Sequence, residues 1–222
     1  MSAPVAPGAR KRVGVLISGR GSNLQSLLDA AADPAYPAEI ALVISNKADA
    51  YGLERARKAG VATAVVDHKA YAGREAFDDA MDAALRAAGC ELICLAGFMR
   101  ILAPGFVNRW PNRILNIHPS LLPSFTGLHV QRRAIEAGAT IAGCTVHIVT
   151  PDLDAGPILA QAAVPVLADD TEASLSARIL EQEHRLYPAA LAWLASGRVR
   201  VDGNRATVDG ATAGGVLLSP QP

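Results

Sequence analysis

The chain has 222 residues, of which 50% are apolar and 19% are charged, a composition that excludes a disordered protein and favours a globular one with a core. Acidic and basic side chains number 21 each, so no net charge favours nucleic acid or an anionic membrane as a partner. No stretch approaches the ~18 apolar residues of a membrane span, and the first apolar run, residues 13–17, is shorter than a signal-peptide core of about 7–15 residues. We therefore expect a soluble, cytoplasmic protein.

Three cysteines, Cys90, Cys94 and Cys144, form an odd set without a paired framework, which is typical of a reducing compartment. The spacing of Cys90 and Cys94 loosely resembles that of zinc ligands. However, Cys94 lies inside an apolar run, and no nearby cysteine or histidine pair completes such a site. We expect these cysteines to be packed in the core, and we expect no metal.

Apolar runs alternate with helical patterns through the first half of the chain. The runs at residues 13–17, 40–45, 61–66, 92–96 and 113–117 are typical of buried strands, whereas residues 24–32, 52–59 and 74–88 have helical spacing. Strands that alternate with helices predict an α/β fold with a doubly wound, mostly parallel, Rossmann-like sheet.

The second half has a different pattern. A helix is expected at 130–137, and the strands expected at 142–149 and 158–166 have no helix between them, which predicts antiparallel pairing. Residues 171–196 form a long helical pattern in which Pro188 should cause a kink or a split. Residues 198–208 predict a terminal hairpin. We expect one domain over residues 13–208, with flexible tails at 1–12 and 209–222.

Two polar residues, Asn116 and His118, interrupt the apolar strand that begins at residue 113. Side chains alternate along a strand, so these two point the same way, roughly 6–7 Å apart. A polar group hidden in a buried strand without a partner costs on the order of 1–3 kcal/mol, and Pro119 then ends the strand. The stretch is compatible with a functional site and equally with a satisfied core histidine beside a turn asparagine.

The glycine-rich turn at residues 18–23 follows a strand and precedes a helix, which is the arrangement of an anion site. A dinucleotide site needs a third glycine and an acidic residue after the second strand. Here Leu24 occupies the third place, and the second strand ends in Ser45-Asn46-Lys47. We interpret Gly21, Ser22 and Asn23 as a cradle for a single phosphate, with a tight structural turn as the alternative.

A second loop, residues 150–157, carries Asp152 and Asp154 between two prolines. One of these carboxylates could orient the ring of His118 and favour its protonated form, although acidic surface turns are also common. Among the other histidines, we expect His147 to be structural and His68 to be an exposed loop residue. His129 could reach a substrate pocket.

Five segments in chain order resemble one family. The resemblance is to the folate-dependent phosphoribosylglycinamide formyltransferases, and it extends from about Val13 to Trp193. Its segments are Ser18-Gly19-x-Gly21-Ser22-Asn23-Leu24-Gln25, Ser45-Asn46-Lys47-Ala48, Ala96-Gly97-Phe98-Met99-Arg100-Ile101-Leu102, Asn116-Ile117-His118-Pro119-Ser120-Leu121-Leu122-Pro123 and Asp154-x-Gly156-Pro157-Ile158.

The resemblance implies transfer of a formyl group from 10-formyltetrahydrofolate, as cosubstrate, to the primary amine of glycinamide ribonucleotide in purine synthesis. It implies small-molecule partners, no nucleic acid or membrane, and a monomer or homodimer. By this resemblance Gly21, Ser22 and Asn23 would hold the phosphate and Glu183 the sugar hydroxyls. The folate pocket would be lined by Arg74, Met99, Arg100, Ile101, Leu102 and Asn116, with the 150–156 loop around the pterin.

The resemblance also implies a catalytic group of Asn116, His118 and Asp154. Attack of an amine on a formyl amide develops negative charge on oxygen, and Asn116 with a protonated His118 supplies two donors for that charge. His118 could then donate its proton to the departing folate nitrogen. The alternatives are a formyltetrahydrofolate hydrolase and a non-catalytic module that binds a nucleotide phosphate.

Overall fold

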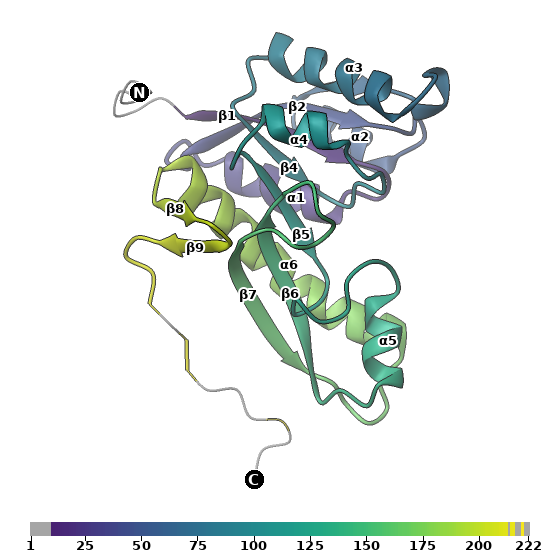
Figure 1. Ribbon diagram of the computed structural model, residues 1–222, viewed down its shortest axis with the longest axis vertical. Coiled ribbons are helices and arrows are strands. Elements are labelled where there is room, and N and C mark those ends of the chain that lie inside the picture. Colours follow the sequence, from purple (N-terminus) through teal and green to yellow (C-terminus); the bar gives the residue numbers. More distant parts are fainter. Residues whose placement is uncertain (1–9, 213, 216–218, 220–222) are drawn as a thin grey trace.

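A nine-stranded sheet in the order β3-β2-β1-β4-β5-β6-β7-β9-β8 organises the protein (Figure 1). The computed structural model describes residues 10–212, 214–215 and 219, so the expectations for residues 1–9, 213, 216–218 and 220–222 lie outside it. The strands are β1 (Lys11–Ile17), β2 (Ala38–Ser45), β3 (Ala62–Val65), β4 (Leu92–Leu95), β5 (Ile114–His118), β6 (Ile141–Ile148), β7 (Ile158–Pro165), β8 (Val199–Asp202) and β9 (Arg205–Val208).

The two halves of the sheet pair as the sequence predicts. Strands β1 to β5 pair in parallel with one another, and the expected antiparallel pairing of β6 with β7 is confirmed. The terminal hairpin of β8 and β9 is also confirmed. Two pairings were not predicted: β6 is also antiparallel to β5, and Arg205 of β9 pairs in parallel with Ile158 of β7, so the hairpin continues the main sheet. The first strand begins at Lys11, two residues earlier than expected.

Helices cover both faces of the sheet (Figure 1). They are α1 (Ser22–Ala31), α2 (Tyr51–Lys58), α3 (Arg74–Ala87), α4 (Pro104–Arg109), α5 (Val130–Glu136) and α6 (Glu172–Ala195), with a short 3₁₀ turn, η1 (His68–Ala70). Apolar side chains of α1, α2 and α6 pack in one core cluster and those of α3 and α4 in another. Neither α4 nor η1 was predicted, because each is too short to establish a period. Within the described residues, no helix is both long and apolar enough to cross a membrane.

A kink or a split was expected at Pro188, and the split is contradicted, because α6 is a single helix through that residue. Its N-terminus is fixed by a capping box, in which Thr171 and Ser174 exchange hydrogen bonds. Beside the proline, Tyr187 and Leu191 are fully buried against the sheet. The lost backbone hydrogen bond at Pro188 is therefore offset by packing on both sides of it.

The three cysteines are buried, as the sequence predicts, and all are free. Burial raises the pKa of the Cys94 thiol to about 12, against an opposing hydrogen bond with Tyr187. The Tyr187 hydroxyl lies 2.9 Å from the carbonyl oxygen of Leu95 and 3.1 Å from that of Leu115. Tyr187 thus ties α6 to the backbone of β4 and β5, directly before Asn116.

Candidate active site

Asn116 is oriented by a histidine on the neighbouring strand. Asn116 of β5 lies opposite His147 of β6 in the antiparallel register, and its Nδ2 is 3.1 Å from His147 Nε2. The other ring nitrogen, Nδ1, is 3.0 Å from the carbonyl oxygen of Ile148 and must donate to it. Nε2 therefore accepts a hydrogen bond from the Asn116 amide, which fixes the rotation of that amide.

His147 is held in this neutral form by its surroundings. Burial lowers its pKa below the ordinary 6.5, and this effect outweighs the Ile148 hydrogen bond and the charge of Asp154, which both raise it. His147 was expected to be structural, and its contact with Asn116 was not predicted. That contact follows from the antiparallel register of β5 and β6, a pairing that was not predicted either.

His118 is enclosed by a carbonyl group and a carboxylate. Its Nε2 is 3.1 Å from the carbonyl oxygen of Phe125, and its Nδ1 is 3.7 Å from Asp154 Oδ2. The two side chains are only 7% and 8% exposed, so solvent screens their attraction weakly. Nε2 can only donate to that carbonyl oxygen, and Nδ1 faces the carboxylate of Asp154 without a hydrogen bond.

The structure brings together the three residues predicted as the catalytic group. Asp154, in a left-handed conformation with φ of 52°, accepts a hydrogen bond of 3.0 Å from the Gly127 amide through Oδ2. Its Oδ1 is 4.0 Å from His147 Nε2. The other carboxylate of the loop, Asp152, is exposed. Of the two candidates, Asp154 is therefore the one that faces His118.

Buried polar groups beneath the loop after β5 hold it in place. Thr145 of β6 accepts a hydrogen bond from the Leu122 amide and donates one to the carbonyl of Ser120. Gln161 of β7 donates to the carbonyl of Leu122 and to Thr145 Oγ1. The antiparallel half of the sheet thus supports the segment that brings Phe125 to His118.

The glycine loop at the end of β1 has the geometry of an anion site. Gly21 precedes α1 in a left-handed conformation with φ of 70°, and a Cβ atom on it would lie 2.7 Å from the Cα of Gly52. The Gly52 amide of α2 donates to the carbonyl of Gly19. The loop therefore packs backbone against backbone, and the first amides of α1, beginning at Ser22, have no partner within the helix and are available to a ligand.

The residues predicted to bind the ribonucleotide lie together across two helices. Asn23 Nδ2 of α1 donates a hydrogen bond of 2.7 Å to Glu183 Oε2 of α6. Asn23 Oδ1 is buried and has no partner within the described chain. Glu183 is buried, where the residues read alone suggested a solvated position. Burial raises the pKa of its carboxyl group, although the Asn23 hydrogen bond opposes this.

The segment predicted to line the folate pocket follows β4. Met99 and Ile101 are 64% and 55% exposed, whereas Leu102 is buried. Arg100 is exposed, and Arg74 is the first residue of α3. Two large apolar side chains exposed beside the ends of the parallel strands are suited to a flat apolar ligand.

Two other histidines, His68 and His129, lie outside the group around His118. His68 is half-buried in η1 rather than exposed, and its Nδ1 is 3.3 Å from Asn46 Nδ2. His129 is largely exposed and lies 3.7 Å from Glu172, so no described contact links it to His118.

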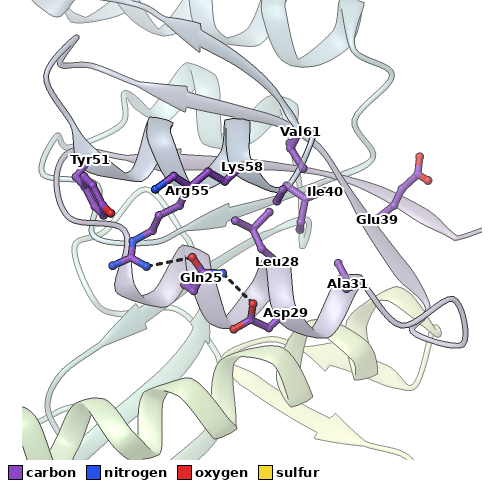
Figure 2. A pocket seen from close by; sticks show the side chains of 12 residues that line it. Gln25, Leu28, Asp29, Ala31, Glu39, Ile40, Tyr51, Arg55, Lys58 and Val61 are labelled. Atoms are coloured by element: carbon purple, nitrogen blue, oxygen red, sulfur yellow. Dashed lines mark hydrogen bonds between the residues drawn. The ribbon is translucent and has the colours of Figure 1, made fainter.

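A groove of about 600 Å³ between α1, α2 and β2 is separate from the predicted catalytic residues. Figure 2 shows Arg55 of α2 bonded to Gln25 of α1 within it. None of the predicted catalytic residues lines this groove, whose side chains are Gln25, Leu28, Asp29, Ala31, Ala32, Glu39, Ile40, Tyr51, Arg55, Lys58, Ala59 and Val61.

Comparisons with known proteins agree with this geometry. The formyl transferase family model matches residues 11–191. A phosphoribosylglycinamide formyltransferase of Escherichia coli strain K12 is 48% identical over 88% of this chain and 92% of that protein. A glycinamide ribonucleotide transformylase of Symbiobacterium toebii has a solved structure that matches with a TM-score of 0.88 and 53% identity, over 90% of this chain and 94% of that one.

Longer relatives also match. The trifunctional purine biosynthetic protein adenosine-3 of Drosophila pseudoobscura is 57% identical over 86% of this chain. The chain spans only 14% of that protein's length, and 19% of its human counterpart. By the family match and the identity over nearly the whole Escherichia coli protein, the chain belongs to the formyl transferase family, in the branch of the phosphoribosylglycinamide formyltransferases.

Proposed function

We propose that this protein transfers a formyl group from 10-formyltetrahydrofolate to the primary amine of glycinamide ribonucleotide. The observation that carries this proposal is the contact network of Asn116, His118 and Asp154 at the carboxyl end of β5. It lies at the same edge of the sheet as the glycine loop, because β1 and β5 are both parallel to β4 between them. Ligands of open α/β sheets bind at this edge.

The ribonucleotide would bind through the glycine loop and α6. Its phosphate would accept hydrogen bonds from the amides after Gly21, where the dipole of α1 also favours negative charge. The ribose hydroxyls can donate to the Glu183 carboxylate and to Asn23 Oδ1, the buried acceptor without a described partner. The orphaned oxygen therefore gains a partner when this substrate binds.

The formyl folate would bind against the Met99–Leu102 side of the site. The exposed side chains of Met99 and Ile101 supply apolar surface for its ring system. The formyl group would then lie near the end of β5, where Asn116 directs its amide.

In the proposed reaction, the substrate amine attacks the formyl carbon and forms a new C–N bond. The charge that develops on the formyl oxygen is stabilised by donors from Asn116 and His118. The bond from the carbon to folate N10 then breaks, and N10 gains the proton of His118. The proton that the amine loses passes by way of Asp154 to His118, which restores the charged imidazole. His118 Nε2 now donates to the Phe125 carbonyl, so this hydrogen bond must be exchanged during the transfer.

The test is an assay of formyl transfer between the two substrates, with product identified by mass. Relative to wild type, His118→Ala is expected to lower kcat by about 10²- to 10⁴-fold, because it removes the general acid. Asp154→Asn keeps the size of the side chain and removes its charge, and a large loss in kcat is again expected. Near-wild-type turnover in both variants would refute the catalytic assignment. Hydrolysis of the folate without transfer to the amine would instead favour a hydrolase.

A further inference from the structure

A buried polar chain crosses the carboxyl ends of three neighbouring strands and ends on the segment after β4. Ser18, just beyond β1, donates a hydrogen bond of 2.6 Å to Asn46 Oδ1, just beyond β2. The Met99 amide in turn donates a hydrogen bond of 2.8 Å to Ser18 Oγ. Ser18 and Asn46 are both buried. None of the roles proposed above uses either residue.

The orientation of the Asn46 amide follows from these bonds. Its Oδ1 accepts from Ser18, so its Nδ2 faces His68 Nδ1 at 3.3 Å and donates to it. The ring of His68 lies edge-on to Phe77 of α3. Both ends of the Asn46 amide are therefore hydrogen-bonded. Because the Ser18 hydroxyl donates to Asn46, its oxygen accepts from the Met99 amide.

The Met99 amide is the fixed point of its segment. Ala96 is still hydrogen-bonded to β1 through the Leu16 carbonyl, and Gly97 then turns the chain with φ of 72°. Ala103 is held by Asp78 of α3. Between Ala96 and Ala103, the Met99 amide is the one backbone donor with a partner among the residues that the structure describes. In the same segment Phe98 stacks on Phe77, and Leu102 packs in the core.

We propose that Ser18 and Asn46 are positioning residues for the formyl folate. They fix the backbone at Met99, and through it the exposed apolar side chains of Met99 and Ile101 that would contact the ring system. This inference rests on the proposed function, since it assigns the folate to that segment. Loss of the hydrogen bonds of Ser18 and Asn46 should weaken binding of the folate. The glycine loop and the catalytic group at the end of β5 should be unaffected, because other contacts hold them.

The experiment compares Ser18→Ala, Ser18→Thr and Ser45→Ala with wild type in the formyl transfer assay. Ser45 is the matched control, because it is a buried serine at the end of β2 whose hydroxyl bonds only to Lys47 within the described chain. Ser18→Ala should raise KM for the formyl folate about 5-fold, the effect of one lost hydrogen bond. Its kcat and its KM for the ribonucleotide should stay within about 2-fold, and Ser18→Thr, which keeps the hydroxyl, should recover most of the loss.

A second measurement tests the role of Asn46. If Asn46 acts through Ser18, the double variant Ser18→Ala/Asn46→Ala should raise the folate KM no more than the larger single change. The inference is overturned if Ser18→Ala leaves the folate KM unchanged, if Ser45→Ala raises it equally, or if both KM values and kcat deteriorate together. Failure of the wild type to transfer formyl at all would instead overturn the proposed function, so the two failures are distinguishable.

Discussion

The glycine loop after β1 and the polar group at the end of β5 (Asn116, His118, His147 and Asp154) present different kinds of binding group. In the glycine loop the binding groups are backbone amides, and its shape depends on the absence of side chains where Gly21 meets Gly52. At the end of β5 the working groups are side chains, and their directions depend on hydrogen bonds from other strands and loops. The binding amides of the first region are consecutive in the sequence, whereas the second region joins residues 116 and 154 through the pairing of β5 with β6.

This difference predicts opposite sensitivities. The end of β5 should be damaged by isosteric changes that leave the backbone untouched, because such changes alter which atom donates. The glycine loop should be damaged by the addition of a single methyl group. Each variant below alters one of these supports and leaves the other intact.

The largest effect is expected from Asn116→Asp, a change of nearly constant shape. The new carboxylate cannot donate to His147 or to the formyl oxygen, so kcat should fall by about 10²- to 10³-fold, as on removal of an oxyanion donor. The KM for the ribonucleotide should change little, because the glycine loop is untouched. Steady-state kinetics measure both, and an unchanged kcat would show that Asn116 does not act on the developing charge.

The glycine loop should respond to Gly21→Ala in the opposite way. The methyl group would strain a left-handed residue, at a cost of roughly 1–2 kcal/mol, and it would press on the backbone of Gly52. We expect the ribonucleotide KM to rise about 10-fold or more, with kcat much less affected.

Gly19→Ala is the matched control for that change. A Cβ atom on Gly19 would meet nothing within 4 Å, and the residue is not left-handed. Kinetics close to wild type are expected. An equal rise in KM for both variants would mean that any side chain in the loop interferes, and that the contact with Gly52 is not the cause.

The contrast between features set by neighbouring residues and features set by distant ones also explains which parts of the structure could be predicted from the sequence. The strands, most helices and the glycine turn follow local patterns, and they were predicted. The contact of His147 with Asn116 was missed, because the two residues are 31 positions apart in the sequence. Glu183 looked like an ordinary helix surface residue, since its burial depends on how α6 packs beside α1. A split of α6 at Pro188, one of the two outcomes expected there, did not occur, because the packing of Tyr187 and Leu191 is not visible in a local pattern.

The polar group should also make stability depend on pH. The folded pKa of His147 is lowered by burial, so the unfolded chain binds the proton more readily. Stability is then complete above pH ~6.5 and decreases as the pH falls below that value. His147→Gln keeps an acceptor for Asn116 but does not titrate, so its Tm should fall less than that of wild type between pH 7 and pH 5.

His184 contributes in the same direction, because burial lowers its pKa as well. The single change at His147 should therefore remove only part of the pH dependence. Adding His184→Gln should flatten it further. A Tm profile for His147→Gln that runs parallel to wild type would rule out titration of His147 as a source of the acid sensitivity.

The smallest effect concerns the outer support of the glycine loop. Arg55 of α2 donates to the Gln25 side chain of α1 (Figure 2). It also donates to the carbonyl of Arg20 in the loop, and so ties the loop to both helices. Lysine at this position keeps the charge but loses the planar fork that makes both bonds. We expect Arg55→Lys to raise the ribonucleotide KM about 2- to 5-fold, the size of one weakened hydrogen bond.

Arg57→Lys on the same helix is the control, because Arg57 is exposed and makes no side-chain contact recorded within the described chain. If both substitutions raise the KM equally, the bonds that Arg55 makes to the loop and to Gln25 are not the cause. If only Arg55→Lys does so, the loop depends on a side chain for its position even though its binding groups are backbone amides. The two regions would then differ in what touches the substrate and not in what holds the site together.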